Sequence, residues 1–358
     1  MKAIARILCA LGVSTVSLSL GCDKVSWPSR NHIASLRVLG VRAEPPTLAP
    51  GKSTRLSVSC ADGIHGGSSD PSCDVEVAWF AGCDNPEKND PKKCFERYAT
   101  LPDQLEPVVA DTEVDRLPKG FGFGREFEFV APDNVLSNAA KAGVNVVHFG
   151  SSYVFFAVCA GQLVTLKGLK DRLPVGCRDR HSQQLLDQSR FVVGVTTIYS
   201  YDLITSRNPE LLSPEFDSVA IPESCIEAAD CPANFDCSTA GECLPVVEVC
   251  SKTHQRGCKV HCLDFALAKS SFGIFGPDGS QLPTPEKSLW LDYFTNAGGL
   301  PDDPTFALLT PKDATTTERS DCIAWVPPPE ATQNAHLWVV VRDNRGGLTV
   351  RDQRILVR

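Results

Sequence analysis

Sixteen cysteines in a chain of 358 residues constrain this protein more than any other feature of its sequence. Outside the cytoplasm, cysteines at this density close disulfides that hold loop-rich folds together. In the cytoplasm they more often bind metals or carry out redox chemistry. The expected fold therefore depends on the compartment, and the first residues of the chain indicate which compartment applies.

The N-terminus has the pattern of an export signal. Lys2 and Arg6 precede an apolar run from Ile7 to Leu20, which is too short to span a bilayer but has the length of the apolar core of a secretory signal peptide. No later stretch offers the roughly eighteen uninterrupted apolar residues of a membrane-spanning helix. We therefore expect residues 1–21 to be a signal peptide and the rest of the chain to be exported.

The end of that run, Gly21-Cys22, resembles the lipobox of bacterial lipoproteins. The resemblance implies cleavage before Cys22 and acyl chains on its thiol and its new amine. These chains would anchor the protein in the cell envelope, at the outer membrane or at the periplasmic face of the inner membrane. Ser19 stands where the lipobox usually has leucine, with Leu18 one position earlier. Plain secretion and an uncleaved anchor are the alternatives.

Export makes disulfides the expected state of the remaining cysteines. Cys9 leaves with the signal peptide and Cys22 is lipidated, so sixteen minus two leaves fourteen, an even number that permits full pairing. The sequence does not fix which cysteine joins which. The candidates are Cys60, Cys73, Cys83, Cys94, Cys159, Cys177, Cys225, Cys231, Cys237, Cys243, Cys250, Cys258, Cys262 and Cys322.

After a short tether at residues 22–35, a period of two predicts β-strands through a first domain at residues 36–205. The first strand is stopped by Pro45-Pro46, and a central strand and a closing strand follow much later in the domain. The strand-like stretches are Ser35–Glu44, Leu56–Cys60, Val75–Trp79, Phe127–Phe129, Tyr153–Cys159, which is apolar on both faces, and the β-branched and aromatic run Phe191–Tyr201.

The order of these strands resembles an immunoglobulin-like β-sandwich, with Cys60 and Trp79 on the inward faces. The resemblance implies an inter-sheet disulfide between Cys60 and Cys159. A loop disulfide between Cys60 and Cys73 is a serious alternative, because the spacing from Cys60 to Cys159 is longer than usual. Long insertions at residues 82–119 and 161–189 carry Cys83, Cys94 and Cys177, which could pin these loops to the scaffold.

Three further segments complete the chain. Residues 206–224 contain three prolines and are expected to be a linker. Residues 225–262 hold seven cysteines and few large apolar side chains, so burial alone cannot stabilise them. They resemble the EGF-like and dickkopf-like cysteine-rich modules of secreted proteins. Seven is odd, so one of these cysteines should pair with Cys322.

Residues 263–358 are predicted to form a second sandwich. Leu337, Val339 and Val341 mark a strand, Asp343–Gly347 a hairpin turn, and the following residues a return strand. This ending resembles PKD-like and bacterial immunoglobulin-like domains. The expected fold is therefore mainly β, with two immunoglobulin-like β-sandwiches flanking a small disulfide-rich module. As a whole it resembles the surface lipoproteins of social and predatory Gram-negative bacteria.

The sequence lacks the G-x-S-x-G motif of serine hydrolases, the HExxH motif of zinc proteases, the Walker loop of nucleotide-binding proteins and the glycine fingerprint of dinucleotide-binding domains. Four groups of residues offer weaker signals of a functional site, and a structural role is favoured for each. They are a zinc site at His261 with Cys258, Cys262 and His254; a nucleophilic pair of Cys177 and His181; a calcium site at Asp302-Asp303; and sugar-stacking by Trp290, Trp325 and Trp338. Oxidised cysteines cannot supply the thiolates that the first two require. We expect no metal and no cofactor.

These observations favour a non-catalytic, lipid-anchored envelope protein that binds or displays. Its partners would be the membrane, through the lipid on Cys22, and an envelope or surface protein or glycan. The net charge of −8 argues against nucleic acid, which needs a basic surface. The alternative from another class is an extracellular hydrolase with its site in the insertions of the first domain, and a third is a structural accessory of an envelope assembly.

Overall fold

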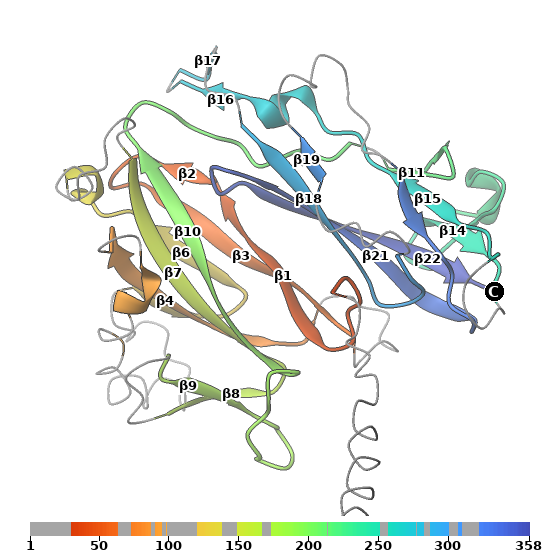
Figure 1. Ribbon diagram of the computed structural model, residues 1–358, viewed down its shortest axis with the longest axis horizontal. Coiled ribbons are helices and arrows are strands. Elements are labelled where there is room, and N and C mark those ends of the chain that lie inside the picture. The colour runs from red at the N-terminus through yellow and green to blue at the C-terminus, as the bar shows by residue number, and fades with distance from the viewer. Residues whose placement is uncertain are drawn as a thin grey trace, which may run out of the picture. The chain divides into compact units, whose positions relative to one another are not determined.

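The protein is almost entirely β-structure (Figure 1). The computed structural model describes residues 30–63, 73–86, 90–94, 98, 120–137, 149–166, 173–212, 214–250, 257–276, 278–282, 287–300, 307–309 and 322–358. Residues 31–358 form one compact unit. None of the helices within the described ranges is long and apolar enough to cross a membrane. The predicted signal peptide and Cys22 lie outside the described residues.

Two sheets make the first sandwich. One has the order β1-β3-β6 and the other the order β2-β10-β7-β4-β5. The strands are β1 (Leu36–Glu44), β2 (Thr47–Leu48), β3 (Ser53–Asp62), β4 (Glu76–Asp84), β5 (Phe121–Phe123), β6 (Glu126–Val130), β7 (Phe149–Cys159) and β10 (Phe191–Tyr201). All lie within the predicted domain at residues 36–205.

The prolines that end β1 carry the chain from one sheet to the other. Neither Pro45 nor Pro46 has a backbone N–H to donate to a ladder. The Glu44–Pro45 bond is cis, and after it β2 pairs in parallel with β10, whereas β1 pairs antiparallel with β3. The first strand is thus shared between the two sheets, and together with the orders above this matches an immunoglobulin-like arrangement.

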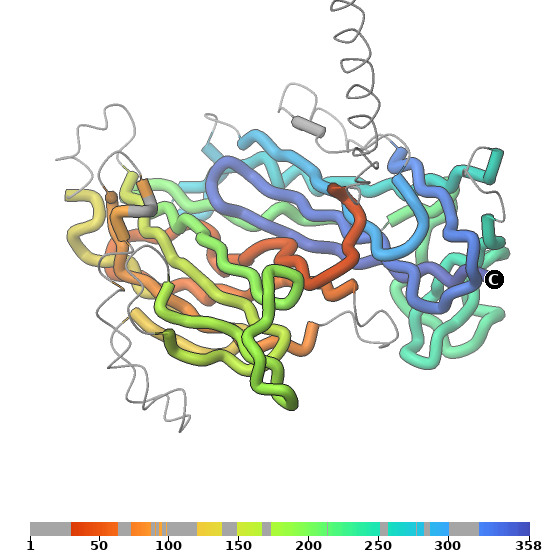
Figure 2. The backbone as a smooth tube through the Cα atoms, turned by 60° about the horizontal axis from the view of Figure 1, so that its bottom comes forward, coloured from red at the N-terminus to blue at the C-terminus, as the bar shows by residue number. Residues whose placement is uncertain are grey.

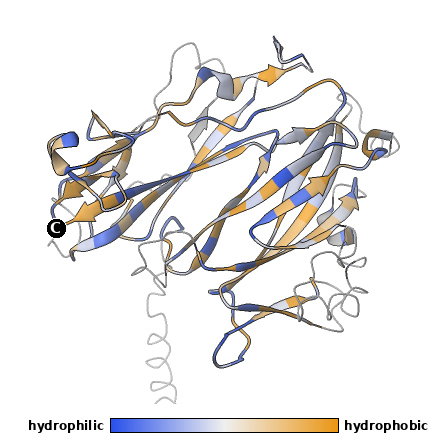
Figure 3. Ribbon diagram, turned by 180° about the vertical axis from the view of Figure 1, so that it is seen from behind, coloured by the Kyte–Doolittle hydropathy of each residue, from blue (hydrophilic) through white to orange (hydrophobic). Residues whose placement is uncertain are grey.

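The core between these sheets contains the inward residues that the sequence predicts. Trp79 is fully buried and stacks on Phe127, with ring centroids 5.7 Å apart. Its indole Nε1 donates a hydrogen bond of 2.8 Å to the carbonyl of Gly124, so burial leaves this polar group paired. Cys60 belongs to the same core. Figure 3 shows the alternation of apolar and polar residues along the long strands.

The central strand β7 is buried on its outer face as well. Val154, Phe156 and Val158 face the sandwich core, while Phe155, Ala157 and Cys159 belong to a second apolar cluster on the other side of the sheet. The insertions cover that side through the hairpin of β8 (Gln162–Thr165) and β9 (Val175–Arg178), the 3-10 turn η2 (Pro91–Cys94), and Tyr98. The prediction that this strand is central is confirmed.

The second sandwich also consists of two sheets, with the orders β12-β11-β15-β20 and β13-β14-β22-β21-β18-β19. Its strands are β11 (Glu215–Phe216), β12 (Val219–Ala220), β13 (Phe235–Cys237), β14 (Cys243–Val247), β15 (His261–Asp264), β18 (Leu289–Thr295), β19 (Ala307–Leu309), β20 (Ile323–Trp325), β21 (Thr332–Asp343) and β22 (Leu348–Val357). A short hairpin of β16 (Ile274–Phe275) and β17 (Gln281–Leu282) stands beside them.

The boundaries of this second half differ from the prediction. Residues 206–224, expected as a linker, contain β11 and β12, and β11 pairs with β15. Residues 225–262, expected as a separate module, contain β14, which pairs in parallel with β22. The second sandwich therefore begins before residue 263. Strands of two to five residues are too short for a two-residue period to reveal them, so composition alone favoured a linker and a module.

The two sandwiches share one strand order. The order β1-β3-β6 corresponds to β11-β15-β20, and the order β2-β10-β7-β4-β5 corresponds to β14-β22-β21-β18-β19, so the parallel pair β2–β10 becomes β14–β22. The second sandwich adds β12 and β13 at the edges of its sheets. In the second sandwich, the first part of the disulfide-rich segment, residues 225–242, lies between β11 and β14. It is thus an insertion into the split first strand of a sandwich.

A further apolar cluster joins the two sandwiches. Leu39 and Ala61 on the first meet Trp338, Val340 and Leu348 on the second, and all five are buried. In Figures 1 and 2, β22, in blue, accordingly lies beside β1, in red. Asn208 reinforces the contact, since its amide nitrogen donates to the carbonyl of Ala43 and its amide oxygen accepts from the backbone N–H of Leu348.

The last part of the predicted tether belongs to this contact. Ile33 is 2 % exposed and lies in the same cluster, and its backbone N–H donates to the carbonyl of Thr295 at 2.7 Å. A single apolar side chain among polar neighbours gives no periodic signal, so the tether was predicted to run to residue 35. The packed chain instead begins at about Asn31.

Candidate binding cavity in the second sandwich

A cavity of about 480 Å³ lies where the disulfide-rich insertion meets the second sandwich. Its walls come from the β11–β12 hairpin, the start of β15, the end of β14 and the segment before β13. Apolar side chains form much of the lining, namely Phe216, Val219, Phe235, Val247 and Val249. The polar lining residues are Asp217, Asn234, Glu248, Lys259 and His261.

The hairpin turn between β11 and β12 places Asp217 against β15. Asp217 and Ser218 both have left-handed backbone conformations, with φ of 49° and 65°, as tight hairpin turns require. The backbone N–H of Asp217 donates to the carbonyl of Cys262, and its Oδ1 accepts the backbone N–H of Cys262 at 2.9 Å. The carboxylate is thus held in one orientation toward the cavity wall.

Asp217 joins two basic side chains. Its Oδ2 lies 2.9 Å from Nδ1 of His261 and 2.9 Å from Nζ of Lys259. His261 is buried and its ring stacks on Phe216, with centroids 5.4 Å apart, whereas Lys259 is exposed. The carboxylate therefore fixes the imidazole while the ammonium remains accessible to solvent.

The pKa of Asp217 lies below its ordinary value. Partial burial by itself raises the pKa of the carboxyl group, but the hydrogen bonds from Cys262, Lys259 and His261 outweigh that effect. The group is therefore ionised at neutral pH. A carboxylate–imidazole pair of this kind orients a histidine for proton transfer or for holding a polar ligand. With the apolar lining, the arrangement suits a small ligand that has one polar end.

All fourteen predicted cysteines are disulfide-bonded. The pairs are Cys60–Cys73, Cys83–Cys94, Cys159–Cys177, Cys225–Cys237, Cys231–Cys243, Cys250–Cys258 and Cys262–Cys322. Cys322 is thus the outside partner that the odd count of seven required. Cys83 and Cys94 join the first insertion to the end of β4.

The immunoglobulin-like pairing of Cys60 with Cys159 does not occur. Side chains alternate along a strand, and Val158 faces the core, so its neighbour Cys159 faces outward and bonds to Cys177 on β9. Cys60 faces inward and closes the loop to Cys73. The alternative prediction, a loop disulfide between Cys60 and Cys73, is confirmed.

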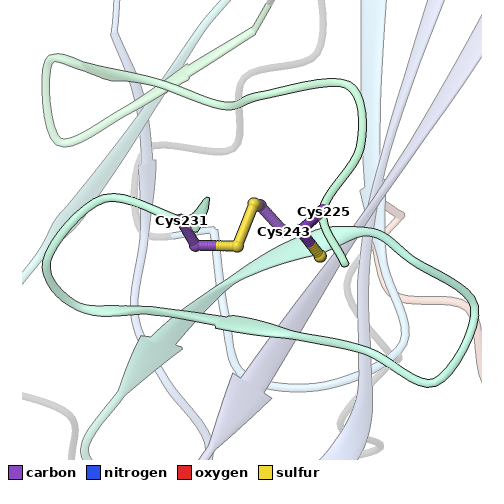
Figure 4. A group of neighbouring side chains, drawn as sticks. All are labelled: Cys225, Cys231 and Cys243. Atoms are coloured by element: carbon purple, nitrogen blue, oxygen red, sulfur yellow. A yellow bond between two sulfur atoms is a disulfide. The ribbon is translucent and has the colours of Figure 1, made fainter. Parts of the chain in front are cut away.

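Cys258 and Cys262, the cysteines near His261, are both in disulfides and supply no thiolate for a zinc site. Nδ1 of His261 is instead hydrogen-bonded to Asp217. Elsewhere, the Sγ atoms of Cys225, Cys231 and Cys243 lie within 4.8 Å of one another (Figure 4). Each belongs to a disulfide. These three sulfurs therefore mark two disulfides stacked closely in the insertion.

Cys177 is 1 % exposed and disulfide-bonded, so it offers no thiol to His181, which is exposed. In the same insertion, Asp179 and Asp187 have pKa values lowered by hydrogen bonds, from Ser182 and His181 in the first case and from Ser189 in the second. Both carboxylates are exposed and cap turns. His254 and Asp302-Asp303 lie outside the described residues.

The tryptophans of the second sandwich serve its packing. Trp325 is fully buried and its Nε1 donates to the carbonyl of Ala297 at 3.0 Å. Trp338 is buried at the contact with the first sandwich, and Trp290 is half-buried on β18. The interpretation of these residues as buried or half-buried strand residues is therefore supported.

Sequence reasoning missed Asp217 and Lys287. Asp217 lay in the predicted linker, and a lone aspartate among prolines gives no signal. Lys287 is fully buried beside Asp343, which the sequence assigned only to a hairpin turn. A lysine that precedes a strand normally indicates an exposed position, so no local pattern could have revealed this pair.

Comparisons with known proteins add little to this description. No family model matches the chain, and no curated protein does. Solved structures with a remote likeness include a mutant of alpha-2-macroglobulin from Salmonella (10% identity, TM-score 0.21) and alpha-2-macroglobulin of Escherichia coli activated by porcine elastase (10% identity, TM-score 0.19). Each match covers 92% of this chain, but 17% and 22% of the respective other chain. The chain thus spans about a fifth of these proteins.

A third likeness is to dimeric latent PorU from Porphyromonas gingivalis, with 9% identity and a TM-score of 0.16. That match covers 94% of this chain and 21% of the other. The cysteine-rich, mainly-β character of the protein follows from its own strands and disulfides.

Proposed function

We propose that this protein is an exported, lipid-anchored protein of the bacterial cell envelope that binds a partner and does not catalyse a reaction. The observation that carries the proposal is the set of seven disulfides. Such a set is consistent with a protein that leaves the reducing cytoplasm. The charged and apolar N-terminus that ends at Gly21-Cys22 supports the anchor.

The disulfides also support a role in presenting surfaces. Two of the three in the first sandwich join insertions to strands and the third closes the loop between Cys60 and Cys73, and four others lie in and around the disulfide-rich insertion of the second. Each bond holds a long loop in one shape without a core of its own. In this proposal, the loops of the first sandwich contact an envelope or surface protein or glycan, and the cavity beside His261 is a second place for a small polar group.

The anchor is tested with Cys22→Ala in a Gram-negative host. We expect loss of acyl labelling and release of the protein from the membrane fraction. Cys9→Ala is the matched control, because that residue lies within the predicted signal peptide and should leave both properties unchanged. Unaltered membrane partitioning of Cys22→Ala would refute lipid anchoring, and retention of reduced protein in the cytoplasm would refute export.

The second candidate is an extracellular hydrolase. The observation that favours it is the pair of Asp217 and His261 beside the cavity, not the insertions of the first domain. A panel of ester, amide and glycoside substrates should then be turned over by the purified protein and not by His261→Gln. Equal turnover by both proteins, or none by either, would contradict this candidate.

A further inference from the structure

A lysine and an aspartate meet in the interior of the second sandwich. Lys287 lies two residues before β18, and Asp343 ends β21, the strand that pairs with β18. Both side chains are 0% exposed, and Nζ of Lys287 lies 2.9 Å from Oδ2 of Asp343. The amine nitrogen therefore lies against one oxygen of the carboxyl group with water excluded.

The other oxygen of this carboxyl group lies between two backbone donors. Oδ1 accepts the N–H of Arg345 at 2.8 Å and the N–H of Gly347 at 2.7 Å. A Cβ at position 347 would lie 2.3 Å from Oδ2 of Asp343, so only glycine allows this approach. Nζ of Lys287 has a second acceptor in the carbonyl of Arg207, at 2.5 Å.

Burial makes the charged form of this pair costly. Removing two ions from water carries a large penalty, which their attraction repays only in part. Burial lowers the pKa of Lys287, the carboxylate of Asp343 opposes that effect, and Arg345 adds to it. The neutral amine, which is the nucleophilic form of lysine, is thus more accessible here than on a surface.

We propose that Lys287 and Asp343 become joined by an intramolecular amide bond. One proton first passes from the ammonium group to Oδ2 of Asp343, which frees the lone pair of Nζ. Nζ then attacks Cγ of Asp343, a bond forms between Nζ and Cγ, and the bond between Cγ and Oδ2 breaks. Of the three protons on the ammonium group, one stays on the amide nitrogen and two leave with Oδ2 as water. The ion pair supplies every atom of the products, so the step needs no oxidant, reductant or second substrate.

The surroundings favour this step over a lasting ion pair. The negative charge of the tetrahedral intermediate develops on Oδ1, where two N–H groups already point. The fold holds the two reacting groups in contact, which removes the entropic cost of bringing them together. In the product, the amide oxygen keeps its two backbone donors and the amide N–H keeps the carbonyl of Arg207. No buried charge remains.

The bond would add a link that reduction cannot open. It would tie the start of β18 to the end of β21 across a sequence separation of 56 residues. Cys262–Cys322 is the disulfide with the longest separation, 60 residues, and reduction removes it. Outside the cell, an amide between the strands would keep the second sandwich closed when its disulfides are lost.

The experiment is the intact mass of the purified protein, denatured, fully reduced and alkylated. We expect it to be lighter by the mass of one water molecule than the sequence requires. A protease digest should contain a branched peptide that joins Lys287 to Asp343. Lys287→Arg is the matched control, since arginine keeps the charge but is no nucleophile, and its mass should agree with its sequence.

The wild-type protein decides the question even where a variant fails to fold. Its full calculated mass, with separate linear peptides containing Lys287 and Asp343, would overturn the proposal and leave an ordinary buried ion pair. A mass deficit that persists in Lys287→Arg would also overturn it, because the water would then have been lost elsewhere.

Discussion

The two sandwiches have one strand order but protect their central strands in different ways. In the first, the outer face of β7 is covered by the insertions of the same domain, through β8, β9 and η2. In the second, the outer face of β21 is covered by the first sandwich, through Leu39 and Ala61. The same topology can therefore have its central strand buried by different parts of the chain. The outer face of β7 is buried by insertions of its own domain, whereas that of β21 is buried by the neighbouring sandwich.

The disulfides follow the same division. Those of the first sandwich close separations of 13, 11 and 18 residues; the first closes the loop after β3, and the other two attach insertions to strands. In the second, Cys262–Cys322 closes 60 residues and links β15 to the residue before β20 within one sheet. Only this bond constrains the framework over a long stretch of chain. The cysteines therefore stabilise mainly the parts that the sandwiches do not bury.

The largest effect is expected at the centre of each core. Trp79→Ala and Trp325→Ala should each lower the free energy of unfolding by about 3–5 kcal/mol, because each removes a fully buried aromatic side chain and its hydrogen bond. Urea unfolding measures both losses. Trp79→Phe and Trp325→Phe are the controls and should cost less. A small effect in one sandwich alone would show that its core is less essential than the common topology suggests.

The disulfides give the next test of the comparison. Replacing Cys262 and Cys322 by alanine should cost about 4 kcal/mol, and replacing Cys60 and Cys73 about 3 kcal/mol, because the stabilisation grows with the length of the closed loop. Chemical denaturation of the two double variants measures the difference. Equal losses would mean that loop length does not govern stability here.

Substituting one leucine at each of the two outer faces tests how the central strands are buried. Leu39→Ala and Leu163→Ala each create a cavity over an outer face and should cost about 2 kcal/mol or more. Leu39→Ala should loosen both sandwiches, and Leu163→Ala only the first. Hydrogen exchange resolved by peptide measures where protection is lost. Protection that falls only in β1 and β3 after Leu39→Ala would contradict the dependence of the second sandwich on the first.

The smallest effect concerns pH. The pKa of Asp217 is lower in the folded protein, so its contribution is present above the unfolded pKa of about 3.9 and is lost as pH falls through the folded value. Asp217→Asn should therefore cost about 1 kcal/mol at neutral pH and progressively less in acid. Thermal unfolding of both proteins from pH 7 to pH 3 measures the gap. A gap that widens in acid would reverse the sign of this prediction.

Long strands were predictable because their patterns persist over many residues. The closing strand Phe191–Tyr201 and the hairpin at Asp343–Gly347 match β10 and the β21–β22 turn. On β21, the sequence showed Trp338 and Val340 between the inward residues. Two apolar faces indicate burial on both sides, and the structure accounts for this with the contact between the sandwiches.

The candidate site was much less predictable. His261 was noticed only as a possible zinc ligand, and its partner Asp217 comes from a two-residue strand with a tight turn. Lys287 and Asp343 are separated by 56 residues. Contacts of this kind depend on strand pairing between distant segments, which leaves no periodic trace in either segment.

By itself, the sequence determined that the protein is mainly β, that its strands fall into two sandwiches and that its fourteen later cysteines are an even set suited to disulfides. Strand periodicity and cysteine number are local or countable properties, so the chain displays them directly. The tertiary structure alone decided that Cys159 faces outward, that the disulfide-rich segment lies within the second sandwich and that Lys287 is buried against Asp343. Each of these depends on which face of a strand is covered and by what, and only the packing of distant segments settles that.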